Sequence, residues 1–221
     1  GGERLLAFHN GVVVDAFSDY VKIIVLVASA ISIAMSVAYL KAEKLGRAEY
    51  PVLVVLATLG MMMMVSANDL ISLYVGLELQ SLSLYVLAAF ARPNLQSEEA
   101  GVKYFLLGAF ATGFIVYGTA LVFGATGFTS FSGIFTAAST GTSSLLLTIG
   151  AALLLVGFGF KVAAVPFHMW TPDVYQGAPT AVTAFMSSGD WPAGFAALLR
   201  VFATAFPSLS ADMTNILWAL A

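Results

Sequence analysis

Long apolar runs separated by short polar connections dominate the sequence. A helix needs about 20 mostly apolar residues to span a bilayer, and several runs approach or exceed that length. The candidate spans are residues 20–40, 51–67, 70–91, 99–125, 145–165 and 191–206, and another apolar run begins in the tail at 211–221. The pattern predicts an all-α integral membrane protein with about six to seven transmembrane helices in a single transmembrane domain, residues 1–221.

The helical pattern is interrupted between residues 160 and 182. Pro166, Pro172 and Pro179 fall in this stretch, and a proline removes a backbone hydrogen-bond donor from a helix. Irregular backbone at membrane depth is tolerated only where protein or a water-filled cavity satisfies its polar groups. The sequence therefore predicts a broken helix around residues 160–182.

The composition agrees with a bilayer environment. Hydrophobic residues make up 60% of the chain and charged residues 10%, whereas soluble domains carry about 25% charged residues. Only five charged residues follow Tyr104, too few to cover the surface of a soluble fold. The absence of cysteine excludes disulfides and thiolate metal sites, and the net charge of -3 provides no basic face for nucleic acid.

Basic residues fall in alternate loops, which predicts the orientation of the chain. They are Lys41, Lys44 and Arg47 after the first span, and Arg92 and Lys103 around the start of the fourth. The turn before residue 70 and the connection at 126–144 contain no Lys or Arg. Since basic loops stay on the cytoplasmic side, we expect the two basic loops to face the cytoplasm.

Three charged residues fall inside apolar spans. They are Glu78, Lys103 and Lys161. A charge at the centre of a bilayer costs at least ~2.5–3.5 kcal/mol, so it faces the protein interior, pairs or becomes neutral. Pairs of this kind change protonation together, as a proton relay requires. Either lysine could instead extend its amine to the membrane surface, and Glu78 could belong to a static polar pair.

His168 is a further candidate for proton transfer, because histidine titrates near neutral pH. It lies in the proline-rich stretch together with Trp170, Asp173 and Tyr175. Histidine and the two aromatic residues could equally form an interfacial belt, with Asp173 in water. Composition alone leaves both interpretations open.

Several segments together carry a resemblance to a known family. The segment FKVAAVPFHMWTPDVYQGAPTAVTAFMSS at 160–188 closely resembles the signature of the antiporter-like subunits of respiratory complex I (NADH:quinone oxidoreductase). YVGLELQSLSLYVL at 74–87, SEEAGVKYFLLGAF at 97–110 and FAALLRVF at 195–202 resemble further helices of that family, in the same order along the chain.

The resemblance implies a role for each candidate residue. Glu78 would pair with a lysine and control its charge, and Lys103 would be a second lysine near Glu78. Lys161 would be the central lysine of a proton channel, and His168 would lie on the connecting loop of the broken helix. Together they would form the proton relay of a membrane subunit in a redox-driven pump.

The resemblance also implies the setting. No cofactor is expected in this chain, whereas quinone, FMN and iron–sulfur clusters are expected in partner subunits. The partners would be the other membrane and hydrophilic subunits of complex I. The location would be the bacterial cytoplasmic membrane or an equivalent energy-coupling membrane.

Two features depart from the family pattern. Family chains are longer, so by this resemblance the chain would be an internal piece that covers the first antiporter-like half, and the remainder of the family's chain would be missing. Trp191 stands where the family has a lysine, between Asp190 and Pro192. This difference puts in doubt a relay from Lys161 towards the missing half.

Two other functions remain open from the sequence. The chain could be a subunit of an Mrp-type monovalent cation/proton antiporter, whose corresponding region is similar but less close in wording. It could also be a structural or assembly subunit that moves no proton.

Overall fold

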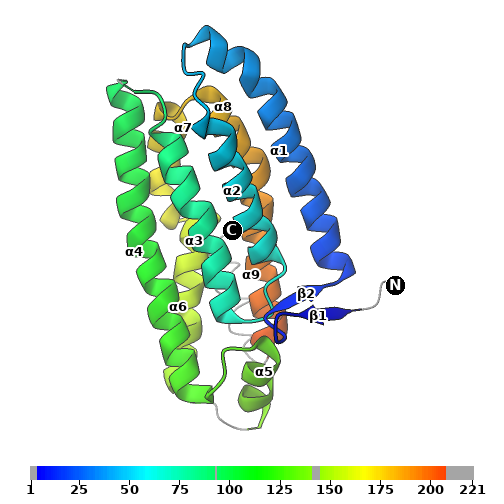
Figure 1. Ribbon diagram of the computed structural model, residues 1–221. Coiled ribbons are helices and arrows are strands. Elements are labelled where there is room, and N and C mark those ends of the chain that lie inside the picture. Colours follow the sequence, from blue (N-terminus) through cyan, green and yellow to red (C-terminus); the bar gives the residue numbers. More distant parts are fainter. Residues whose placement is uncertain (1–3, 93, 141–144, 208–221) are drawn as a thin grey trace.

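The computed structural model describes residues 4–92, 94–140 and 145–207, and it forms a bundle of helices (Figure 1). The apolar run predicted at 211–221 lies outside the described residues. The larger helices are α1 (Ala16–Ala42), α2 (Glu49–Val65), α3 (Leu70–Ala88), α4 (Leu95–Thr126), α6 (Leu145–Lys161) and α9 (Trp191–Ala205). The shorter segments are α5 (Phe131–Ser139), the 3₁₀ turn Phe167–Trp170, α7 (Thr171–Gly177), α8 (Thr180–Phe185) and the π-helical turn Met186–Asp190.

Six helical segments of the described structure can account for the predicted spans. Three helices, α1, α3 and α4, are long and apolar enough to cross a membrane, and α2 and α6 are shorter apolar helices. At 1.5 Å per residue, the 17 residues of α2 and of α6 each cover about 25 Å. The sixth segment is continuous from α8 through the π-helical turn into α9. The predicted membrane protein is confirmed, with most helix boundaries within a few residues of expectation.

Close helix crossings hold the bundle together. A Cβ added to Gly60 of α2 would lie 2.4 Å from the backbone nitrogen of Gln80, and one added to Gly76 of α3 would lie 2.6 Å from that of Met64. Helices in membranes associate through small residues that allow such close backbone approach. These glycines therefore fix α3, which carries Glu78, against α2.

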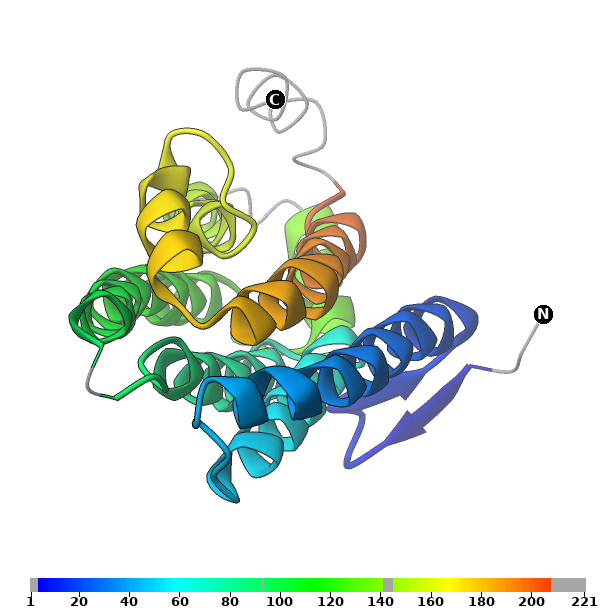
Figure 2. The ribbon, with the colours of Figure 1, turned by 90° about the horizontal axis from the view of Figure 1, so that it is seen from above.

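The segment formed by α8, the π-helical turn and α9 packs against α1 and α2 (Figure 2). Helix α9 contacts α1, α2, α5 and α6. The described parts of the basic loops, residues 43–48 and 89–92, lie at the same end of the bundle as α7 (Figure 1). The opposite end carries the N-terminal strands and α5.

The predicted broken helix is confirmed, but α6 ends at Lys161 rather than near Pro166. Ala163 adopts φ +49, in the left-handed region. The Ala164 N–H donates to Gly159 O at 2.8 Å, and the Ala163 N–H donates to Phe160 O at 3.1 Å. This Schellman motif ends the helix at Lys161, five residues before Pro166.

The N-terminal segment contains a small β-hairpin that the sequence pattern did not predict. Strands β1 (Leu5–Ala7) and β2 (Val12–Val14) pair antiparallel. The Val13 N–H donates to Ser66 O at 2.8 Å, which joins the hairpin to the turn between α2 and α3. Strands of three residues are too short to show alternating polarity, so the all-α prediction missed them.

Candidate functional site

A buried ion pair lies at the break after α6. Lys161 Nζ is 3.2 Å from Asp190 Oδ1, and the two side chains are 7% and 0% exposed. Asp190 is the last residue of the π-helical turn. The ion pair therefore joins the C-terminal end of α6 to the point where the π-helical turn passes into α9. Burial of both charges is costly unless each neutralises the other.

Polar side chains from α3 and α4 complete the surroundings of this pair. Lys161 Nζ donates to Ser81 Oγ at 3.3 Å. The buried Gln80 amide donates to Asp190 Oδ1, and the Tyr104 hydroxyl lies 3.5 Å from Asp190 Oδ2. Each charge of the ion pair is thus held by further hydrogen bonds, which is the condition under which buried charges are tolerated.

Glu78 lies on α3, with its side chain partly buried. Thr112 Oγ1 of α4 donates to Glu78 Oε1 at 2.8 Å. The resemblance implied a pairing of Glu78 with a lysine, but among the described residues neither Lys103 nor Lys161 forms its ion pair with Glu78. Lys161 instead contacts Asp190 and Ser81, and Lys103 contacts Glu99 and Asp173.

A small cavity lies beside Lys161 and is also lined by Thr112, the hydrogen-bond partner of Glu78. Its volume is about 10 Å³, comparable to the space that one water molecule requires. Thr112, which binds Glu78, lines the cavity together with Ser81, Tyr85 and Lys161. On α3, Glu78, Ser81 and Tyr85 are spaced as i, i+3 and i+7, so they share one face of the helix.

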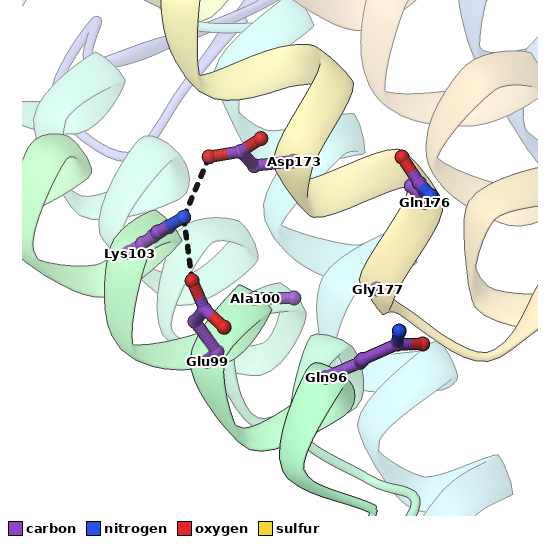
Figure 3. Close-up of a pocket in the computed structure, with 7 residues that line it drawn as sticks. All are labelled: Gln96, Glu99, Ala100, Lys103, Asp173, Gln176 and Gly177. Atoms are coloured by element: carbon purple, nitrogen blue, oxygen red, sulfur yellow. Dashed lines mark hydrogen bonds and ion pairs between the residues drawn. The ribbon is translucent and has the colours of Figure 1, made fainter.

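Lys103 belongs to a different, exposed cluster with Glu99 and Asp173 (Figure 3). Its Nζ lies 2.7 Å from Glu99 Oε1 and 2.7 Å from Asp173 Oδ2. The Lys103 side chain is 41% exposed, and the two carboxylate side chains are more exposed still. The three residues line an open pocket of about 120 Å³ between α4 and α7. This geometry links α7 to α4 and does not bring Lys103 to Glu78.

His168 lies on the 3₁₀ turn after the break, and its side chain is exposed. The neighbouring Trp170 is 1% exposed and stacks against Tyr104, with ring centroids 4.8 Å apart. Its indole N–H donates to Phe160 O at 3.1 Å. The interfacial-belt interpretation is therefore wrong for Trp170, which packs inside the bundle beside the buried ion pair.

Two charged contacts were not assigned from the sequence. The sequence analysis names Asp190 only as the neighbour of Trp191, although a lone acidic residue in an apolar span is the same signal that singles out Glu78. Arg200 of α9 forms two hydrogen bonds to Asp15, at 2.8 and 3.0 Å. Because of the Arg200 guanidinium, the pKa of Asp15 at the start of α1 lies well below its usual range. Asp15 is distant in sequence, so only the folded chain reveals this pair.

The described residues contain no group of three or more His, Cys, Asp or Glu that could hold a metal ion. The site is instead built from one buried ion pair, hydrogen-bonding side chains and a small internal cavity. Such an arrangement can hold and pass protons between neighbouring groups. The fold and the site thus define a membrane protein with a buried, protonatable centre at a helix break.

Comparison with known proteins places this class of protein in a family. Residues 67–221 match the family described as NADH:quinone oxidoreductase/Mrp antiporter, transmembrane region. The match covers more than half of the chain, and the chain belongs to this family.

Relatives and solved structures are similar over most of this chain. A protein of Trichlorobacter lovleyi named NADH-quinone oxidoreductase subunit N is 49% identical over 222 residues, which cover 100% of this chain and 46% of that protein. A chain of respiratory complex I from Thermus thermophilus matches with a TM-score of 0.78 and 40% identity, over 90% of this chain and 42% of that one. A chain of the Mrp complex from a Dietzia species matches with a TM-score of 0.75 and 28% identity, over 88% and 36%. This chain therefore spans less than half the length of these relatives.

Proposed function

We propose that this chain is a membrane subunit of a redox-driven proton pump of the NADH:quinone oxidoreductase type. It translocates protons through buried Glu and Lys groups, coupled to quinone reduction in other subunits. The observation that carries the proposal is the ion pair of Lys161 and Asp190, buried in the bundle where α6 breaks. Buried ionisable groups inside a membrane protein mark ion pathways and proton relays.

The cavity beside Lys161 supports a path for protons. Glu78 bonds to Thr112, Thr112 and Ser81 line the cavity, and Ser81 contacts the Lys161 ammonium group. A water molecule in this cavity would complete a hydrogen-bonded connection from the Glu78 carboxylate to Lys161. Protons would pass along this connection from Glu78 to Lys161.

Lys103 and His168 act in this proposal at the water-exposed end of the path. Both side chains are exposed, and Lys103 lies beside two carboxylates in an open pocket. Groups in this position exchange protons with water and deliver them towards the buried part of the relay. Their contribution is smaller than that of Lys161, because water offers protons alternative routes at the surface.

The relatives' names support the proposed setting. One relative is a named subunit N of NADH-quinone oxidoreductase, and one solved structure is a respiratory complex I. By analogy, the partners of this chain are the other membrane and hydrophilic subunits, which carry quinone, FMN and iron–sulfur clusters. This chain holds no cofactor of its own and resides in the bacterial cytoplasmic membrane, with its basic loops in the cytoplasm. Residues 1–221 form one transmembrane domain, the first antiporter-like half of the family fold.

Proton pumping by the assembled complex tests this function. Lys161→Met in proteoliposomes is expected to reduce pumping and the linked quinone reductase activity together, by about a hundredfold for the loss of a positioned proton-transfer group. Glu78→Gln is expected to reduce both as well. Lys41→Met, which removes an exposed lysine at the end of α1, is the matched control. Wild-type pumping in the Lys161→Met complex would contradict the proposal and favour a structural role.

The likeness to the Mrp complex supports a second candidate, a subunit of a monovalent cation/proton antiporter. The lower identity of 28%, against 40% for the complex I chain, makes it the weaker candidate. Proton exchange that depends on sodium and proceeds without quinone chemistry would favour the antiporter over the redox pump.

A further inference from the structure

Asp190 occupies an unusual place for a charged residue. Its side chain is 0% exposed, and it ends the π-helical turn that precedes α9. Pro192 follows two residues later and has no N–H to donate. A π-helical turn within a helix frequently marks a functional site, and here it places the carboxylate against the last turn of α6.

Helices α3, α4 and α6 each contribute a polar group to Asp190. Lys161 of α6 forms the ion pair, Gln80 of α3 donates a hydrogen bond, and Tyr104 of α4 lies within 3.5 Å. Tyr85 of α3 and Tyr175 of α7 are near enough to interact with its charge. Lys161 is the cationic residue that contacts the Asp190 carboxylate among the described residues. A proton that moves between the two groups therefore changes the charge of both members of the pair and leaves the sum unchanged.

We propose that Asp190 is a proton-carrying residue that receives a proton from Lys161 and releases it by way of the Tyr104 hydroxyl. This inference rests on the proposed proton-pumping function and assigns a residue to the step after Lys161. Its basis is the direct contact of 3.2 Å between two groups that are both buried.

In each cycle the ion pair takes up one proton and releases one proton. The Lys161 ammonium first gives a proton to Asp190 Oδ1, which leaves a neutral amine and a neutral carboxylic acid. The amine then takes a new proton from the cavity shared with Ser81. The ammonium now has no counter-charge, and a lone buried charge is strongly unfavourable. Asp190 therefore passes its proton from Oδ2 to the Tyr104 hydroxyl oxygen, 3.5 Å away. Tyr104 gives its own hydroxyl proton to a water in the cavity that it lines, and the original ion pair is restored.

Gln80 can bind Asp190 in both protonation states. In the charged state its amide N–H donates to the carboxylate. Its amide oxygen is buried and has no hydrogen-bond partner among the described residues. A carboxylic acid donates a hydrogen bond that a carboxylate does not, and a rotated Gln80 amide would present its oxygen to accept it. The rotation breaks no bond made by that oxygen.

Infrared difference spectroscopy on the assembled complex during turnover tests the inference. The wild-type complex is expected to show the C=O band of a protonated carboxylic acid that appears and decays with each turnover. Asp190→Glu keeps a carboxyl group, so it is expected to retain pumping and to shift the frequency of this band. Absence of such a band in the wild-type complex would overturn the inference, whether or not any variant assembles.

Pumping by variants separates this inference from the proposed function. Asp190→Asn is expected to lower pumping by about a hundredfold, while Asp19→Asn, an exposed acid in the first turn of α1, leaves it unchanged. Loss of pumping in Lys161→Met together with wild-type pumping in Asp190→Asn would overturn the role of Asp190 without contradicting the proposed proton-pumping function. Wild-type pumping in Lys161→Met would instead overturn the proposed function. If the Asp190→Asn complex fails to assemble, the infrared band of the wild-type complex and its shift in the Asp190→Glu variant still test the role of Asp190.

Discussion

Lys161 and Lys103 both lie in helices and both contact carboxylates, but they occupy opposite environments. The distance from Lys103 to its two carboxylates is 2.7 Å, shorter than the 3.2 Å between Lys161 and Asp190. The Lys103 side chain is nevertheless 41% exposed, against 7% for Lys161. Water and salt screen the first cluster, whereas the second is shielded from both. Burial, and not distance, therefore determines which lysine depends on its partner.

The difference follows from the break in α6. The Schellman motif after Lys161 ends that helix inside the bundle, where Asp190 arrives from the π-helical turn. Lys103 lies near the start of α4, beside α7 (Figure 3). The pair of Arg200 and Asp15 is intermediate, with side chains 5% and 24% exposed. The three clusters form a series. The loss of stability on removing one partner should decrease as the exposure of the paired side chains increases.

Removal of Lys161 is expected to give the largest loss of stability in this series. Lys161→Met leaves the Asp190 charge buried without its partner, which typically costs about 3–5 kcal/mol. Resistance of the purified complex to unfolding by detergent measures the change. A loss below about 1 kcal/mol, the level of an exposed pair, would show that the two clusters are energetically alike.

Asp15→Asn is expected to have an intermediate effect. The substitution weakens two hydrogen bonds with Arg200, and bonds to charged groups contribute about 1.5–3 kcal/mol. The same unfolding measurement applies, with Asp19→Asn as the matched control on α1. Equal stability of the Asp15→Asn and Asp19→Asn variants would show that the contact between Arg200 and Asp15 contributes no measurable stability.

Acidification should weaken the same contact. Because the Arg200 guanidinium lowers the pKa of Asp15 in the folded protein, the contact contributes stability above the unfolded pKa of about 3.9. That contribution is lost as the pH falls below this value towards the folded pKa. The unfolding of the wild-type complex and of the Asp15→Asn variant, compared at pH 7 and pH 3, measures it. The difference between them should shrink at low pH, and an unchanged difference would contradict this assignment.

Lys103→Met is expected to have the smallest effect on stability. Exposed ion pairs contribute about 0.2–1 kcal/mol, and salt screens them. The difference from wild type should decrease further when the salt concentration rises during the unfolding measurement. A loss as large as that of Lys161→Met would mean that the pocket between α4 and α7 is closed in the membrane.

Much of the fold follows from the sequence because membrane helices require long apolar runs, and these runs are visible without any tertiary information. The cap of α3 is local as well, since Asp69 accepts from the N–H groups of Ile71 and Ser72 as its position suggests. The sequence pattern places the end of α6 too late, because the helix ends where Ala163 adopts the left-handed conformation. Glycine is the residue that usually occupies this conformation, so an alanine gives no sequence signal for it.

The site was only partly predictable for a different reason. Lys161 was identified because a charge in an apolar run is conspicuous by itself. Its partner required knowledge of which helices meet, since Asp190 lies in another segment of the chain. The same holds for Glu78, whose contact with Thr112 depends on the packing of α3 against α4. The relay roles of Glu78, Lys103, Lys161 and His168 stay predictions until pumping is measured.

A double-mutant cycle on Lys161 and Asp190 tests the central feature of the site most directly. The variants are Lys161→Met, Asp190→Leu and the two combined, all measured by unfolding of the complex. Each single change leaves one buried charge, whereas the double change leaves none and is expected to be far less destabilising than the sum of the two. A coupling energy of at least about 2 kcal/mol would confirm a buried ion pair at the helix break. Additive effects would contradict it.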